Sequence, residues 1–303
     1  MTASSAPAGE FSLESTTAPG RAARDIVFKV LLYASIGLAL GTLAALLFDT
    51  YQQGAGRLDW SLYEKYPSER ISRAGIRSAI FGSLWVVTFT AALALPLGVG
   101  TAIYLEEFAS RDRWYNRLIE LNIQNLAAVP SIVYGILGLA YIARGPLGWG
   151  RTLGTASMTL ALVVLPTVII ASREAIRAVP PSIRQGALAL GATQWQSVWR
   201  NVLPGAVPGI ATGSILAMSR ALGESAPLIL LGGLAFVSFN PDPGFGALDD
   251  QYTVLPIQIF QYAVNAKTEF HELAAASIMV LLALLLTMNG AAILIRNKFQ
   301  RKW

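Results

Sequence analysis

Two charged residues interrupt an otherwise apolar stretch, and they are the first candidates for chemistry. Arg220 and Glu224 lie within residues 208–237, a segment long and apolar enough to cross a membrane. A charge at bilayer depth costs about 3 kcal/mol or more, so such residues persist where they are paired or functional. Their spacing of four places both side chains on one face of a helix. A guanidinium offers a planar set of donors that suits an oxyanion such as phosphate or sulfate.

The pair suggests how an oxyanion would be held and selected. A crossing anion must exchange its water hydrogen bonds for others, and Arg220 would supply bidentate ones. Phosphate near neutral pH keeps a P–OH proton, from which an ionised Glu224 would accept a hydrogen bond; sulfate has none. The alternative is structural, with the two side chains neutralising each other and fixing helix packing. Ser219 and Ser225 are neighbouring candidates for binding, although helix hydroxyls more often bond to their own backbone.

A second polar group opens another apolar segment, 119–143. Asn122, Gln124 and Asn125 crowd its start, and Pro130 interrupts it. We expect a membrane span whose polar end faces a wet region, with Asn122 and Asn125 as further candidates for substrate binding. The alternative for these amides is hydrogen bonding between helices.

The composition sets the class of protein. Of 303 residues, 54% are hydrophobic and 14% are charged, against about 25% charged in soluble domains. This predicts an all-α integral membrane protein. Cysteine is absent and His271 is the single histidine, which excludes disulfides and makes a zinc site very improbable. No phosphate-binding G-x-x-x-x-G-K-[ST] motif occurs, so any ATP hydrolysis is expected in another subunit. With one histidine, no cysteine and no cluster of carboxylates within the spans, we also expect no bound cofactor, no metal and no catalysis in this chain. The basic residues flank apolar segments, so the net charge of +5 does not indicate nucleic-acid binding.

The apolar segments and the basic residues together predict a topology. Six segments reach the length of about 20 residues that a span needs: 26–48, 79–105, 119–143, 153–172, 208–237 and 273–295. With both termini cytoplasmic, the inner segments hold 14 Lys and Arg residues and the outer ones 8, as the positive-inside rule requires. The expected layout is a disordered tail (1–25), a first span with an external loop (26–78), a five-span core (79–296) and a basic tail (297–303). Within the core, an external loop (235–272) is expected to carry a short interfacial helix after Pro256.

The connection 173–204, cytoplasmic in this topology, is unusually well organised. The two prolines at 180–181 suit the start of a short helix, and Gly191 is a plausible stop. Thr193 and Gln196 have the spacing of a capping box, which predicts the start of a second helix. We therefore expect a helix–turn–helix at the membrane face. It either joins two spans or serves as a docking element for a cytoplasmic partner.

The order of residues in this connection resembles a known family. Gln185-Gly186-Ala187, Gly191 and Leu203-Pro204 are similar to the EAA loop of ABC importer permeases, with Pro204 expected to end the second helix. The resemblance implies the type I permease fold and a coupling helix that enters a cleft of the ATPase subunit. The residues implied in ATPase coupling are Gln185, Gly186, Ala187, Leu188, Ala189, Leu190 and Gly191.

Three further stretches narrow the resemblance to permease subunits of phosphate importers, of the PstA type. They are 122–139, 203–229 and 252–260, and the similarity covers about 79–295. It implies phosphate import by alternating access in the cytoplasmic membrane of a prokaryote. The implied partners are a PstC-type permease subunit, two ATPase subunits that bind ATP and Mg²⁺, and an extracytoplasmic phosphate-binding protein. A permease for sulfate or molybdate, and a membrane signalling or scaffold protein, are the alternatives; an integral membrane enzyme finds little support.

Overall fold

The computed structural model describes residues 19–110, 112–233 and 236–299 of the chain. Most of the expected tail at 1–25, and the last residues of the basic tail at 297–303, lie outside the described residues. The helical elements, among which η3, η4 and η5 are π-helical turns, are α1 (Pro19–Gly54), η1 (Ala55–Arg57), α2 (Trp60–Glu64), η2 (Ile71–Arg73), α3 (Arg77–Ile103), η3 (Tyr104–Phe108), α4 (Trp114–Ala128), α5 (Ser131–Leu137), η4 (Gly138–Ala143), α6 (Leu153–Arg177), α7 (Pro181–Ala189), α8 (Gln194–Ser197), η5 (Val198–Val202), α9 (Leu203–Gly223), α10 (Ala226–Leu231), η6 (Gly244–Asp249), α11 (Leu255–Ala263) and α12 (Thr268–Phe299).

The apolar segments form helices of the expected kind. Within the described residues, five helices are long and apolar enough to cross a membrane, and a bent pair would make a sixth span. The five are Arg24–Arg57, Arg77–Phe108, Leu153–Arg177, Gln194–Gly223 and Thr268–Ala291. The all-helical membrane class is therefore confirmed. The chain divides into two units, Met1–Asp49 and Thr50–Trp303.

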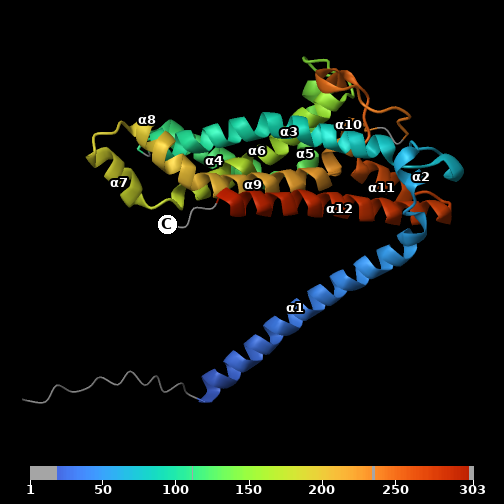
Figure 1. The fold of residues 1–303 in the computed structure, drawn as a ribbon, viewed down its shortest axis with the longest axis horizontal. Coiled ribbons are helices and arrows are strands. Elements are labelled where there is room, and N and C mark those ends of the chain that lie inside the picture. The colour runs from blue at the N-terminus through green and yellow to red at the C-terminus, as the bar shows by residue number, and fades with distance from the viewer. Residues whose placement is uncertain (1–18, 111, 234–235, 300–303) are drawn as a thin grey trace, which may run out of the picture. The chain divides into compact units, whose positions relative to one another are not determined.

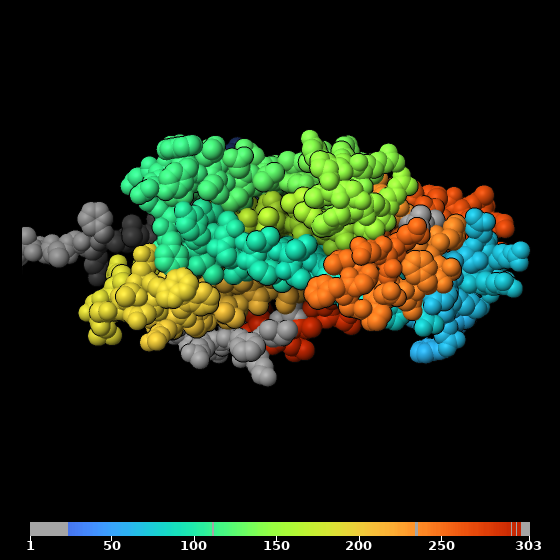
Figure 2. Space-filling view, turned by 90° about the horizontal axis from the view of Figure 1, so that it is seen from above, coloured from blue at the N-terminus to red at the C-terminus, as the bar shows by residue number. Residues whose placement is uncertain are grey.

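In the second unit, four long helices lie side by side: α3 packs on α6, α6 on α9, and α9 on α12 (Figure 1). Their contact surfaces are apolar, and one core cluster joins Val164, Val168, Ala217 and Met218. The α7–α8 connection lies at one end of this unit, and α2 and α11 lie at the other (Figure 1). Figure 2 shows the same separation, with the yellow α7–α8 region projecting opposite the orange residues around 240–260. The expected cytoplasmic and external connections thus occupy opposite ends.

The fifth span differs from the expected 208–237. The helix ends at Gly223, and α10 is a separate short helix. The break has a local cause, because a continuous helix needs the N–H of residue 227 to bond to the carbonyl of Gly223, and Pro227 has no N–H. The helix begins instead at Gln194, so the span occupies Gln194–Gly223.

Pro204 does not end the helix that begins after Thr193, and that expectation was wrong. The π-helical turn Val198–Val202 continues directly into α9, where Pro204 occupies the first turn. A proline has no N–H to donate to the preceding turn of an α-helix. The wider π-helical turn before Pro204 changes the backbone hydrogen bonds there, so the helix continues. The rest of the connection is as predicted: α7 starts at the second proline, Gly191 is left-handed at φ 84°, and the Thr193–Gln196 capping box is formed.

The third span is bent rather than straight. Helices Trp114–Ala128 and Ser131–Ala143 meet at 102° at Pro130, as a broken span or a re-entrant loop would. The second piece, α5, packs against α10. Gly135 makes this approach possible, because a Cβ there would lie 2.6 Å from the Cα of Pro227. The two interrupted helices are therefore neighbours.

The helix expected after Pro256 forms as α11, and one side of it is buried against the rest of the unit. Leu255, Ile257, Gln258 and Tyr262 are fully buried. Leu255, Ile257 and Tyr262 pack into the cores formed with α3, α10 and α12. The predicted helix therefore forms, and its position at a membrane interface stays a prediction.

Candidate functional site

Arg220 lies near mid-depth of the helical bundle. A Cβ at Gly209 would contact Ala175 Cβ at 2.8 Å, and one at Gly213 would contact Ala171 Cβ at 2.6 Å, so α9 runs antiparallel to α6 in a defined register. Extending this register places Arg220 level with Val164, near the middle of Leu153–Arg177. A helix of this length spans roughly 37 Å, so the Arg220 backbone lies more than about a dozen ångströms from either end.

The guanidinium faces outward from this chain. The side chain of Arg220 is 61% exposed, and its Nε is 3.4 Å from Oε1 of Glu224, whose side chain is 17% exposed. Within the described residues this is the only ion pair or hydrogen bond of the Arg220 side chain. Leu216, one turn earlier on the same face, is also exposed. The two Nη groups therefore stay available, and the pair is not locked into a dry contact inside this chain.

The helix break positions Glu224. Its backbone is extended (φ −75°, ψ 114°), and its N–H still bonds to the carbonyl of Ala221 at 3.2 Å. Ser225 follows as the residue preceding α10, half-buried, with no hydrogen bond from its side chain to that helix. Arg220, Glu224 and Ser225 thus lie together at one interruption of the helix, beside α5.

The other predicted substrate-binding residues lie in different surroundings. Ser219 is buried, and its Oγ is 2.7 Å from Oδ1 of Asn289 on α12, which joins the two helices. Asn122 donates from Nδ2 to its own helix at the Leu118 carbonyl, 2.8 Å away. Asn125 is exposed on α4. No contact ties these three residues to Arg220 within the described chain, so their role in binding stays a prediction.

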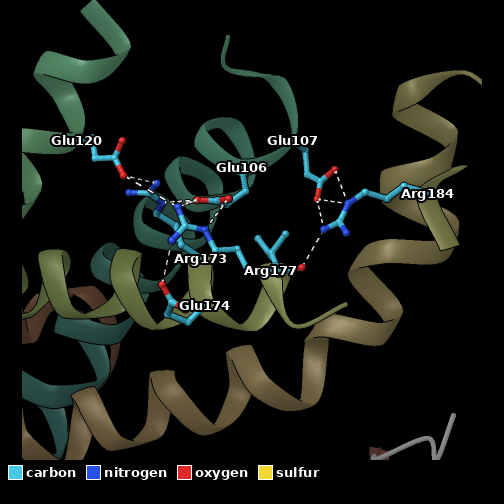
Figure 3. Close-up of polar contacts among 8 residues, drawn as sticks. Glu106, Glu107, Glu120, Arg173, Glu174, Arg177 and Arg184 are labelled. Atoms are coloured by element: carbon cyan, nitrogen blue, oxygen red, sulfur yellow. Dashed lines mark hydrogen bonds and ion pairs between the residues drawn. The ribbon is translucent and has the colours of Figure 1, made fainter. Parts of the chain in front are cut away.

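A network of ion pairs at the α7 end of the unit was not expected from the sequence. Figure 3 shows that carboxylates from the end of α3 and from α4 meet arginines from α6 and α7. Arg173 Nε lies 2.6 Å from Glu106 and its Nη2 lies 2.7 Å from Glu120; Arg177 Nη2 lies 2.8 Å from Glu106. The side chains of Arg173 and Glu106 are only 9% and 5% exposed. Such pairing offsets the desolvation of the charges.

A further ion pair lies beside this network and involves α7. Arg184, on α7, places Nη2 2.7 Å from Oε1 of Glu107, which is 6% exposed. The sequence does contain a signal for the network. Two adjacent glutamates close one apolar span, while three arginines spaced along 173–184 close another and follow it. Because charged residues at helix ends usually face water, that pattern alone did not distinguish buried pairs from a solvated surface.

The residues expected to couple to an ATPase form an exposed rim. Gln185, Gly186, Leu188 and Ala189 are exposed on α7, and Leu190 is 92% exposed at the turn. No residue of α7 is fully buried. A helix that presents apolar side chains to solvent at the end of a bundle is typical of a surface that a partner covers.

Comparisons with known proteins agree with these features. Residues 94–300 match the family model described as binding-protein-dependent transport system inner membrane component. The chain is 31% identical over 281 residues to the phosphate transport system permease protein PstA of Mycobacterium leprae, covering 90% of this chain and 89% of that one. It is 32% identical over 214 residues to the probable ABC transporter permease protein YqgI of Bacillus subtilis, covering 68% and 72%.

Solved structures show the same fold. A chain of a bacterial alginate ABC transporter aligns with a TM-score of 0.62 at 17% identity, covering 92% of this chain and 98% of that one. A chain of the inward-facing MetNI methionine ABC transporter aligns with a TM-score of 0.59 at 19% identity, covering 78% and 100%. At these identities the likeness concerns the fold alone.

Proposed function

The chain belongs to the family of binding-protein-dependent transport inner membrane components, and on this premise we propose that it is the permease subunit of an ATP-driven phosphate importer. Relatives that cover most of the chain carry the name phosphate transport system permease protein. The observation that carries the proposal is the guanidinium of Arg220, open at mid-depth on a membrane helix.

Arg220 would replace the water of the travelling anion. Its two Nη groups can form a bidentate, charge-assisted pair with phosphate oxygens. Glu224, 3.4 Å from Nε, holds the guanidinium and can accept a hydrogen bond from a P–OH group. The exposed face that carries the pair needs a cover other than lipid, because a charge against acyl chains is costly. A second, PstC-type permease subunit on this face would enclose the pathway.

The helices that line the pathway would be moved by partner ATPase subunits. The exposed residues of α7, Gln185 to Gly191, would dock on an ATPase that binds ATP and Mg²⁺, and closure of the ATPase pair would rock the helices around the anion. In this proposal the α7–α8 end and both chain termini would lie in the cytoplasm, in agreement with the distribution of Lys and Arg. The opposite end, with α2 and α11, would face an extracytoplasmic phosphate-binding protein.

Reconstitution tests this function directly. The chain is assembled in proteoliposomes with a PstC-type subunit, the ATPase and the binding protein, and ATP hydrolysis is measured with and without phosphate. We expect phosphate-loaded binding protein to stimulate hydrolysis and labelled phosphate to accumulate. Sulfate and molybdate serve as competitors, and stimulation by either in place of phosphate would assign another oxyanion. Absence of both hydrolysis and flux would point to a signalling or scaffold role.

A further inference from the structure

The helix expected to contact the ATPase is held to the rest of the chain by few contacts. Among the residues of α7 none is fully buried, and the half-buried Ile183 is its one side chain packed against an apolar core cluster, the one around Ile176 and Val202. Apolar packing alone therefore fixes α7 weakly, since stabilisation follows the area removed from water. Its position must depend on the polar contacts beside Ile183.

Arg184 provides most of those polar contacts. Its Nε lies 3.0 and 3.2 Å from the two carboxylate oxygens of Glu107, and its Nη2 lies 2.7 Å from the nearer one. The same guanidinium donates to the carbonyls of Ile176 and Val179, both at 2.8 Å. These carbonyls lie at and just beyond the end of α6, where a helix lacks its own donors. One side chain thus joins α7 to the ends of both α3 and α6.

Glu107 also holds the second helix of the connection. Its backbone carbonyl accepts a hydrogen bond from Nε2 of Gln194, the first residue of α8. The next residue, Phe108, contacts Trp195, with ring centroids 6.0 Å apart. Both halves of the helix–turn–helix therefore meet the chain at the same point, the π-helical turn that ends α3.

The preceding carboxylate points to a different helix. Glu106 pairs with Arg173 and Arg177, both on α6, whereas Glu107 pairs with Arg184 on α7. The end of α3 is thus fixed to α6 by Glu106 and to the connection by Glu107. Since α3 and α6 are tightly packed along their length, a displacement of α7 has a rigid element to act upon.

We propose that Glu107 and Arg184 form the joint through which movement of α7 is passed to α3 and α6. This inference rests on the proposed function, because it assigns the path by which an ATPase bound to α7 would act on the helices around Arg220. Both residues are positioning residues, because they lie at the α7 end of the unit and would not touch the anion at Arg220.

The test measures coupling rather than activity alone. Glu107→Gln, Arg184→Lys and wild type are compared in the reconstituted complex, with phosphate transported per ATP hydrolysed as the readout. We expect this ratio to fall about tenfold in Glu107→Gln, within the usual range for coupling between sites, while hydrolysis without binding protein persists. Glu174→Gln is the matched control, because it removes a carboxylate that pairs with Arg177 within α6 and joins no second helix. A simple loss of fold would lower transport and hydrolysis together.

A second measurement is independent of the importer function. Since the chain has no cysteine, spin labels can be placed at Ser182→Cys, on α7, and Leu97→Cys, on α3, both exposed. We expect one narrow distance distribution in the otherwise wild-type chain and in Glu174→Gln, and a broad one in Glu107→Gln. An unchanged distribution in Glu107→Gln overturns the joint even if the complex transports nothing. An unchanged coupling ratio in that variant, or an equal loss in Glu174→Gln, overturns it as well.

Discussion

Arg220→Lys separates recognition of the anion from maintenance of the fold. The substitution keeps the positive charge and removes the planar fork of donors. Among the residues that the structure describes, the Arg220 side chain forms one ion pair, with Glu224 at 3.4 Å, and it is 61% exposed, so the pair contributes about 0–1 kcal/mol to stability. Loss of a charge-assisted hydrogen bond to the anion costs about 1.5–3 kcal/mol, which corresponds to about a 10- to 150-fold slower uptake.

The assay compares two readouts on the same preparation. Initial uptake of labelled phosphate is measured in proteoliposomes that contain the full complex, and the free energy of unfolding is measured in detergent. The control is Arg57→Lys, since Arg57 also forms an exposed ion pair, with Glu272 at 3.3 Å. This pair joins η1 to the first turns of α12, away from Arg220. Normal uptake by Arg220→Lys would refute bidentate recognition. A loss of several kcal/mol of stability would show instead that the pair holds the helices together.

Three further substitutions follow from the same reasoning. Glu224→Gln removes the acceptor for a P–OH group, so we expect the preference for phosphate over sulfate in competition uptake to fall about tenfold; an unchanged preference contradicts this role. Glu106→Gln removes the buried carboxylate that the buried Arg173 shares with the partly exposed Arg177, and unfolding in denaturant should show a loss of about 3–5 kcal/mol, against about 0–1 kcal/mol for the exposed control Glu272→Gln. Gly135→Ala places a Cβ 2.6 Å from the Cα of Pro227 and should cost about 1–3 kcal/mol by separating α5 from α10; equal stability would show that the two helices can shift apart.

Local signals in the sequence predicted local structure well. The Thr193–Gln196 capping box and the stop at Gly191 depend on residues within one or two turns of each other, and both formed. The apolar segments also became helical, although two of them, 119–143 and 208–237, are interrupted. The expected end at Pro204 was wrong because a π-helical turn lets the helix continue through a proline. The break after Gly223 had a local cause in Pro227, but the apolar residues on both sides masked it.

Local sequence patterns could not predict contacts between residues that are far apart in the sequence. Glu106 and Arg173 are 67 positions apart, and nothing within either segment shows that they share a buried site. The same holds for α11, whose apolar side chains pack into cores formed with helices from elsewhere in the chain. For the candidate site, the sequence identified the charged pair and its spacing. It did not show that Ser219 would be engaged by Asn289 on α12.

The arginines of this unit differ in the length of their ion pairs and in their exposure, and this difference supports a role in transport for Arg220. Arg173 and Arg184 bind their carboxylates at 2.6–2.7 Å, and Arg173 and both partner glutamates, Glu106 and Glu107, are almost fully withdrawn from solvent. Arg220, near mid-depth, has one longer contact and an open face. If its purpose were only to pack helices, it would gain from the short, enclosed geometry that the same chain builds elsewhere. A guanidinium that is held loosely and left accessible is instead suited to bind and release an ion that passes.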